Sequence, residues 1–477
     1  MNKILKKIIL FVFISILASN LYSQNIESGI TAAKNGDYVK AVSLLKGAVT
    51  GEDSYEGYYY YGLALLNTGS LKDAETNLKK ALTKDNEGVE ALTTLADLYS
   101  KKKEYDKADT YYKKALKEDP ENINALLAQA KNYTNAGKVD EAITVLTFAK
   151  TLSQNSPNIY VGLGDAYYYR RAFKPALDNY NEALKLQSSN SKAHYGLGRV
   201  YFREKKYNDA MEEYKKAVQS NQNFADGYLE LGRLYYFNEN YNDALEAFNK
   251  YAQLQPGSIE GQTYIGKVLY GQKKYDEALA KLEEVMKNNP NEDISSAYKY
   301  MAYVYSDKEQ YDKSLEYFSK VPKTLFDVED YIELAQVYGN KSDYNNAFKI
   351  LSEAAVVDST NDEIYYQTGI IQFNQKNYED AIISFDKALR LGSQQITPYV
   401  YKGLSYYGLQ NYEEAIKQFD AAIALDNSYV QSWLWKAKSE FFLEKFDDAK
   451  ASYNKVLELD PNNKIAQEDL VLIEQKQ

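Results

Sequence analysis

The residues "YLELGRLY" (Tyr228–Tyr235), followed by "ALEAF" (Ala244–Phe248) and Pro256, decide the fold of this chain. Apolar and small residues recur three or four positions apart in both stretches, which is the spacing of neighbours on one face of an α-helix. Proline ends a helix because it lacks a backbone N–H and clashes with the preceding turn. The segment therefore predicts two amphipathic helices that end before Pro256.

The same pattern recurs with a period of 34 residues. We number each unit so that an aromatic or large apolar residue stands at position 17 and a small residue at position 20. Position 8 is Gly or Ala in every unit, and position 24 is Leu, Tyr or Phe. Since one unit cannot bury its faces alone, the units are predicted to stack into an all-α solenoid. The thirteen pairs at positions 17 and 20 are Tyr38/Ala41, Leu71/Ala74, Tyr105/Ala108, Val139/Ala142, Phe173/Ala176, Tyr207/Ala210, Tyr241/Ala244, Tyr275/Ala278, Tyr311/Ser314, Tyr344/Ala347, Tyr378/Ala381, Tyr412/Ala415 and Phe446/Ala449.

This pattern resembles the tetratricopeptide repeat (TPR) family, whose signature is Trp-x-x-Leu-Gly-x-x-Tyr, then Ala-x-x-x-Phe, then Pro. Tyr228 replaces the Trp of the signature, and Trp433 retains it. The resemblance covers about residues 22–463. It implies a right-handed TPR superhelical solenoid of about 13 helix-turn-helix repeats, and a protein that binds other proteins rather than an enzyme.

Residues 1–24 have the three parts of a secretory signal peptide and its cleavage region: the basic "MNKILKK", the apolar "IILFVFISILA" and the small, polar "SNLYSQ". The apolar run is short for a membrane span. We predict cleavage after Ser23 and export to the periplasm or cell envelope of a bacterium. A buried N-terminal helix and an uncleaved anchor are the alternatives. No later stretch is apolar enough to span a membrane.

The repeat register slips in two places and divides the exported chain. "NNPNEDISS" (Asn288–Ser296) carries extra residues, and "KVPKTLFD" (Lys320–Asp327) puts Pro322 where a second helix should still run. We interpret this as a hinge or a change in superhelical pitch. The predicted organisation is a signal peptide at 1–23, repeats 1–8 at 24–292, repeats 9–13 at 293–463 and a C-terminal capping helix at 464–477.

Composition excludes several classes of chemistry. Without cysteine and with a single histidine, the chain has no disulfide, thiolate ligand or multi-histidine metal site. The net charge of −10 argues against nucleic-acid binding. His194 falls at position 4 and Gly196 and Gly198 at positions 6 and 8, so we interpret all three as helix packing. No catalytic motif, metal site or cofactor site is predicted.

The candidate binding residues are those that the repeat does not require. The resemblance implies that positions 2, 5, 9, 12 and 13 of the first helices face a bound segment in the concave groove. Position 9 is cationic in three successive units, which predicts a stripe for an acidic protein or peptide segment. A merely solvated helix face is the alternative. The predicted partner-binding residues are Lys192, Tyr195, Arg199, Phe202, Arg203, Arg233, Tyr236, Phe237, Lys267 and Tyr270.

Two further functions remain open. The groove positions at both ends look apolar and suit docking faces of a secretion or outer-membrane assembly machine, or contacts between turns of the solenoid. They include Tyr59, Leu63 and Leu66 in repeat 2, and Val400, Leu404, Leu434 and Phe442 in repeats 11 to 13. Aromatic groove residues could instead stack on sugar rings, as in a carbohydrate binder. The 48 tyrosines mostly occupy packing positions of the repeat and indicate core rather than binding surface.

Overall fold

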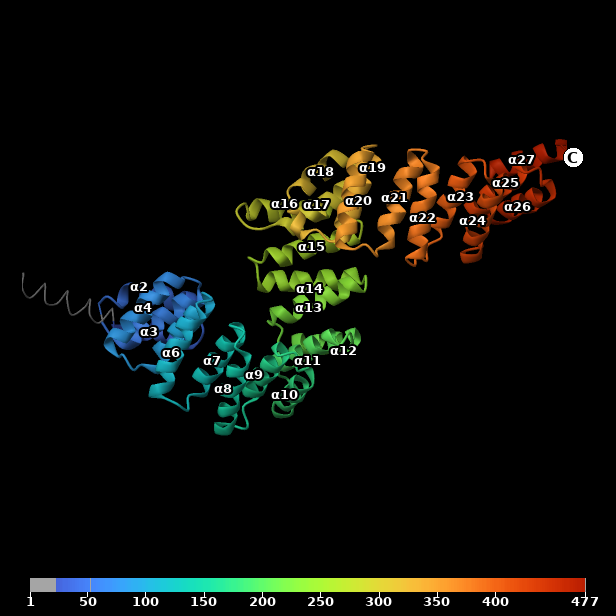
Figure 1. Ribbon diagram of the computed structural model, residues 1–477. Helices are drawn as coiled ribbons and strands as arrows, with labels where there is room; N and C mark the ends of the chain where they lie inside the picture. Colours follow the sequence, from blue (N-terminus) through green and yellow to red (C-terminus); the bar gives the residue numbers. More distant parts are fainter. Residues whose placement is uncertain (1–22, 52, 477) are drawn as a thin grey trace, which may run out of the picture. The chain divides into compact units, whose positions relative to one another are not determined.

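The computed structural model describes residues 23–51 and 53–476 (Figure 1). These residues form α-helices and one short 3-10 helix, with no strand among them. The all-α solenoid predicted from the repeat is therefore confirmed. Apart from Ser23, the predicted signal peptide lies outside the described residues.

Each repeat contributes a pair of helices. The second helix of every pair begins at position 17, as the periodicity predicts. These second helices are α2 (Tyr38–Ala48), α4 (Leu71–Lys84), α6 (Tyr105–Glu118), α8 (Val139–Leu152), α10 (Phe173–Leu186), α12 (Tyr207–Ser220), α14 (Tyr241–Leu254), α16 (Tyr275–Asn288), α18 (Tyr311–Ser319), α20 (Tyr344–Val357), α22 (Tyr378–Arg390), α24 (Tyr412–Leu425) and α26 (Phe446–Leu459).

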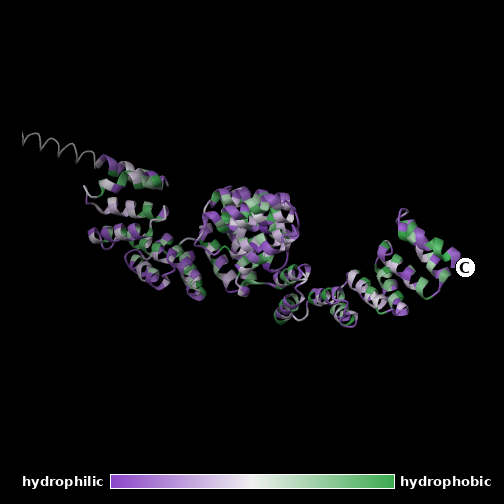
Figure 2. Cartoon of the chain, turned by 90° about the horizontal axis from the view of Figure 1, so that it is seen from above, coloured by the Kyte–Doolittle hydropathy of each residue, from purple (hydrophilic) through white to green (hydrophobic). Residues whose placement is uncertain are grey.

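The first helices precede them in the same order. Figure 2 shows green apolar and purple polar residues mixed along the helices of the chain. The first helices are residues 23–34, α3 (Tyr55–Asn67), α5 (Val89–Lys101), α7 (Ile123–Asn135), α9 (Pro157–Tyr169), α11 (Ser191–Arg203), α13 (Ala225–Phe237), α15 (Ile259–Gly271), α17 (Ser295–Asp307), α19 (Val328–Asn340), α21 (Asp362–Asn374), α23 (Thr397–Gly408) and α25 (Val430–Phe442).

The chain forms two compact units, the first ending at Asn238 and the second beginning at Glu239. The predicted divisions at residues 292/293 and 463/464 stay predictions. A last helix, α27 (Lys464–Lys476), follows α26 and buries Ala466 and Ile473 against the end of the second unit.

The two helices of a pair approach closely because position 8 has little or no side chain. In repeat 6, a Cβ added at Gly198 would lie 2.5 Å from Cε1 of Tyr214 at position 24, closer than van der Waals contact permits. The ring of Tyr214 therefore lies directly against the backbone of α11. Position 20, which is Ala or Ser, is fully buried in all thirteen repeats. These contacts explain why positions 8, 20 and 24 are restricted in the sequence.

A left-handed residue at position 15 separates the helices of each pair. Lys205 is the example in repeat 6, with φ of 60°. The N–H groups of Lys205 and Lys206 donate to the carbonyls of Phe202 and Tyr201, which satisfies the end of α11 in the Schellman manner. Ten of the thirteen repeats use a residue other than glycine at this position. The tight turn is thus imposed by packing of the helices, against the local preference of the residue.

Repeat 9 departs from the others, as the position of Pro322 predicts. Its second helix, α18, spans 9 residues and ends at Ser319, and the 3-10 helix Lys323–Leu325 follows Pro322. The same repeat carries Ser314 at position 20. Its hydroxyl is fully buried and has no hydrogen-bond partner among the described residues. A buried hydroxyl without a partner lowers stability.

Replacing Ser314 with Ala is expected to raise the free energy of unfolding of the second unit by about 1 kcal/mol, because the unpaired hydroxyl is removed. The matched control is Ser439→Ala. Ser439 is also fully buried, but its hydroxyl donates to the Trp435 carbonyl at 2.7 Å. Urea unfolding followed by the fluorescence of the two tryptophans, both in repeat 13, checks this. Equal effects of the two substitutions would contradict the prediction.

Candidate functional site

The first helices form the inner face of the first unit. Neighbouring first helices contact each other in the series α3, α5, α7, α9 and α11, whereas no two successive second helices of the described chain make contacts of that extent. The stack therefore curves with its first helices on the concave side, the side that repeat solenoids use for binding.

Two hollows lie on this inner face. The N-terminal hollow has a volume of about 640 Å³ and is lined mainly by α3, α5 and α7, including Leu63 and Asp97. The central hollow has a volume of about 400 Å³ and is lined mainly by α7, α9 and α11. Lys131 and Asn135, both on α7, line both hollows. The two hollows therefore form one groove.

Three of the predicted residues, Lys192, Tyr195 and Arg199, line the central hollow. The Tyr195 ring packs edge-on against Phe224, with centroids 5.3 Å apart. The exposed Lys192 side chain forms no ion pair with another described residue. These placements agree with the groove positions that the repeat phase assigns to Lys192 and Tyr195.

Arg199 is engaged within the fold. Its guanidinium carbon lies 3.9 Å above the centroid of the Tyr168 ring, and Nη1 is 3.5 Å from Oδ1 of Asp165. The Arg199 side chain is only 19% exposed. The Arg199 guanidinium therefore links repeat 6 to Tyr168 and Asp165 of repeat 5.

Asp165 is the carboxylate at the centre of this hollow. Burial by the walls of the hollow raises the pKa of Asp165, although its side chain remains 39% exposed. The hydroxyl of Tyr180, which donates to Oδ1 at 2.7 Å, and the positive charges of Arg199, Lys192 and Lys131 act in the opposite direction. Asp165 therefore anchors one tyrosine and is surrounded by three cations.

Phe202 and Arg203, at the end of α11, do not line the central hollow. Phe202 packs edge-on against Tyr207 of its own repeat, with centroids 5.4 Å apart. Arg203 is exposed, and its Nε donates to the Tyr168 hydroxyl at 3.1 Å. Both residues thus lie beside the hollow rather than in it.

The predicted residues of repeat 7 lie on α13. Nη1 of Arg233 is 2.7 Å from Oε1 of Glu230, one helical turn earlier. Tyr236 is half-buried, and Phe237 is 74% exposed. The Arg233 charge is therefore balanced by a neighbour on its own helix.

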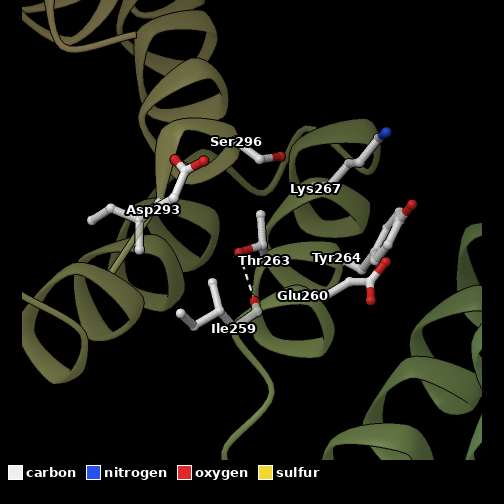
Figure 3. A pocket seen from close by; sticks show the side chains of 8 residues that line it. Ile259, Glu260, Thr263, Tyr264, Lys267, Asp293 and Ser296 are labelled. Carbon is white, nitrogen blue, oxygen red and sulfur yellow. Dashed lines mark hydrogen bonds between the residues drawn. The ribbon is translucent and has the colours of Figure 1, made fainter. Parts of the chain in front are cut away.

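Lys267 and Tyr270 belong to the second unit. Lys267 lines a separate hollow of about 380 Å³ with residues of α15 and the segment before α17 (Figure 3). Its Nζ is 5.1 Å from the centroid of the Tyr300 ring. Tyr270 packs among Tyr275, Tyr300 and Tyr303, and burial raises its pKa. A continuous stripe from Arg199 to Lys267 stays a prediction, because the two residues lie in different units.

Sequence reasoning missed Lys131. It stands at position 9 of repeat 4, and position 9 of repeats 3 to 6 reads Asp97, Lys131, Asp165 and Arg199. The sign of the charge at position 9 therefore alternates from repeat 3 to repeat 6. A search for a run of like charges overlooks this pattern, whereas a search by repeat position finds it.

The expectation for repeats 11 to 13 is partly wrong. Val400 and Leu434 are each only 4% exposed, so they belong to the core and not to a groove surface. Phe442 remains 53% exposed and packs with Tyr407 and Tyr412.

The single histidine has a packing role. His194 is buried, with Nδ1 2.6 Å from Oε2 of Glu213 and Nε2 3.0 Å from the carbonyl oxygen of Ser188. Gly196 and Gly198 lie within α11 against the rings of Tyr180 and Tyr214, so they do not form a phosphate-binding loop.

The described residues contain no cluster of acidic or histidine side chains placed to hold a metal ion. Nor does any helix in residues 23–51 or 53–476 have the length and apolar character to cross a membrane.

The geometry predicts different roles for two neighbouring cations. Arg199→Met should increase the exchange rates of the slowest α11 amides about tenfold, equivalent to about 1.4 kcal/mol, because the contacts with Tyr168 and Asp165 are lost. Lys192→Met should leave these rates within about twofold. Hydrogen exchange measured by mass spectrometry checks both. A Lys192→Met effect as large as that of Arg199→Met would contradict this assignment.

Comparison with known proteins places the chain in a family. The tetratricopeptide repeat model matches residues 26–89, 229–293, 332–396 and 402–464, which is more than half of the chain. A TPR repeat model matches residues 198–239, and the model of the TT21 fifth ARM repeats domain matches residues 89–202. A search of the curated proteins gives no match.

Several solved structures are similar to this chain over much of its length. The APC/C hetero-tetramer Cut9-Hcn1 is 15% identical, with 93% of this chain and 94% of that chain covered and a TM-score of 0.48. A tetratricopeptide repeat protein from Parabacteroides merdae is 20% identical, with 52% and 99% covered and a TM-score of 0.45. Yeast Tom70 is 17% identical, with 95% of each chain covered and a TM-score of 0.36. On the extent of the family-model match, this chain belongs to the tetratricopeptide repeat family.

Proposed function

We propose that this chain is an exported TPR interaction protein that holds an extended segment of a partner protein in the groove of its first unit. It acts as a binding module or scaffold and catalyses no reaction. The observation that carries the proposal is the pair of hollows on the first-helix face, joined at Lys131 and Asn135. A continuous groove that crosses several repeats suits an extended polypeptide segment better than a small molecule.

The dimensions of the groove set the length of the segment. Packed helices lie about 8–10 Å apart, and an extended chain advances about 3.3 Å per residue. Roughly three partner residues therefore pass each repeat. The groove extends from Leu63 on α3 to Asp226 on α13. A segment of about twelve residues is long enough to engage both hollows.

Binding to the groove is tested by selecting displayed random dodecapeptides on the chain that begins at Gln24. Asn135→Trp places a bulky side chain where the two hollows meet and is expected to weaken the selected peptides at least about tenfold. Gln219→Trp is the control, because Gln219 is an exposed amide on the second helix α12 and lines neither hollow. Fluorescence anisotropy gives the affinities. Peptides that are insensitive to Asn135→Trp, or a selection that enriches none, would contradict the proposal.

Export is tested separately on the native protein. Cleavage of the predicted signal peptide should leave a mature chain that begins at Gln24, in the periplasmic or envelope fraction. N-terminal sequencing of the protein purified from its own cells gives the answer. A chain that retains its first 23 residues in the cytoplasmic fraction would refute export while leaving the groove proposal intact.

A further inference from the structure

The central hollow carries a surplus of positive charge in a chain whose net charge is −10. Its walls hold three cations, Lys131, Lys192 and Arg199, and two carboxylates, Asp165 and Asp226. One additional carboxylate would make the hollow electrically neutral. The surplus is therefore local and opposite in sign to the rest of the molecule.

Two of the three cations are available to a partner. Arg199 is held by Asp165 and Tyr168, as described above. Lys131 and Lys192 are exposed, and neither forms an ion pair with another described residue. Both nevertheless act electrostatically on the Asp165 carboxylate from two different helices, α7 and α11. The two lysines thus converge on one point of the groove without being neutralised there.

Apolar and aromatic side chains surround these charges. Leu127 and Val161 line the hollow from α7 and α9, and Tyr169, Tyr195 and Phe224 complete its walls. A segment that brings a charge to the lysines therefore also finds contacts for apolar neighbours of that charge. An apolar setting strengthens an ion pair, because it excludes water and raises the interaction energy.

We infer that an Asp or Glu side chain of the bound segment is held between Lys131 and Lys192, beside Asp165, with apolar residues of the segment on either side. This inference rests on the proposed function, because it assigns the chemistry of the segment in that groove. It moves the acidic-segment site away from Arg233 and Lys267 and adds Lys131 to the predicted residue Lys192. Arg199 holds Asp165 in place and packs on the Tyr168 ring beside the hollow.

The probe is a pair of N-acetylated dodecapeptide libraries with random apolar and polar residues, one with Glu fixed at the centre and one with Gln. The Glu library is expected to bind the mature chain about tenfold more tightly at low salt, since the carboxylate meets two unpaired ammonium groups. The difference should shrink as salt is raised, because screening weakens exposed charge pairs. Fluorescence anisotropy of the labelled libraries measures both affinities.

Four variants and one control locate the site. Lys131→Met and Lys192→Met are each expected to reduce the preference for Glu to about threefold, and the double variant to remove it. Asp165→Asn should increase the preference, because it removes a competing carboxylate without changing the shape of the side chain. Lys174→Met is the control, since Lys174 is an exposed lysine on α10 that does not line the hollow.

The outcomes separate this inference from the proposed function. If both libraries bind equally well and Asn135→Trp weakens both, the groove binds segments but the carboxylate site is wrong. If neither library binds, the groove proposal falls and the inference falls with it. If inorganic phosphate binds at Lys131 and Lys192 more tightly than the Glu library does, the site belongs to a phosphate group and the inference is overturned. A preference for Glu that Lys174→Met reduces as much as Lys131→Met does would also overturn it.

Discussion

The close approach of position 8 to the ring or branched side chain at position 24 is the constraint on which this structure depends. At Gly198 even a methyl group would meet Tyr214 at 2.5 Å, and Gly369 and Gly403 meet Phe385 and Phe419 in the same way. Because this contact sets the distance between the helices of a pair, it also fixes the tight turn between them and the buried small residue at position 20. Each repeat then presents its first helix to the next, which builds the inner face.

That frame divides the residues into two groups. Positions 8, 20 and 24 serve the packing, whereas position 9 points into the groove and is free to carry charge. The first unit uses this freedom to alternate Asp97, Lys131, Asp165 and Arg199. Three of these four side chains already interact within the fold. Arg199 pairs with Asp165, and the Tyr112 hydroxyl donates a hydrogen bond to Asp97 at 2.5 Å. Lys131 at position 9 and Lys192 at position 2 form no ion pair with another described residue. A partner can therefore contribute binding energy at these two lysines.

The helix pairs and their packing positions could be predicted from sequence because the unit recurs thirteen times. The residue types at one repeat position can therefore be compared across thirteen units. The start of every second helix and the burial of position 20 follow from that recurrence. The groove could be predicted only in part. Repeat position predicts that Lys192 and Tyr195 lie on the groove face, and both line the central hollow, but their binding of a partner stays a prediction. The engagement of Arg199 by Asp165 depends on how repeats 5 and 6 are stacked. Val400 and Leu434 were assigned to a surface because apolar character alone does not distinguish a groove from a buried interface.

The most direct test of this account is hydrogen exchange on the mature chain carrying Gly198→Leu, which forces a side chain into the space occupied by Tyr214. Gly47→Leu is the matched control, since Gly47 is also helical but has no atom within 4 Å of an added Cβ. The account predicts that Gly198→Leu removes protection from α11 and α12 and weakens it in the adjacent repeats, while the second unit keeps its protection and Gly47→Leu changes little. Full protection of α11 and α12 in the Gly198→Leu chain would show that the close approach does not hold the repeat together.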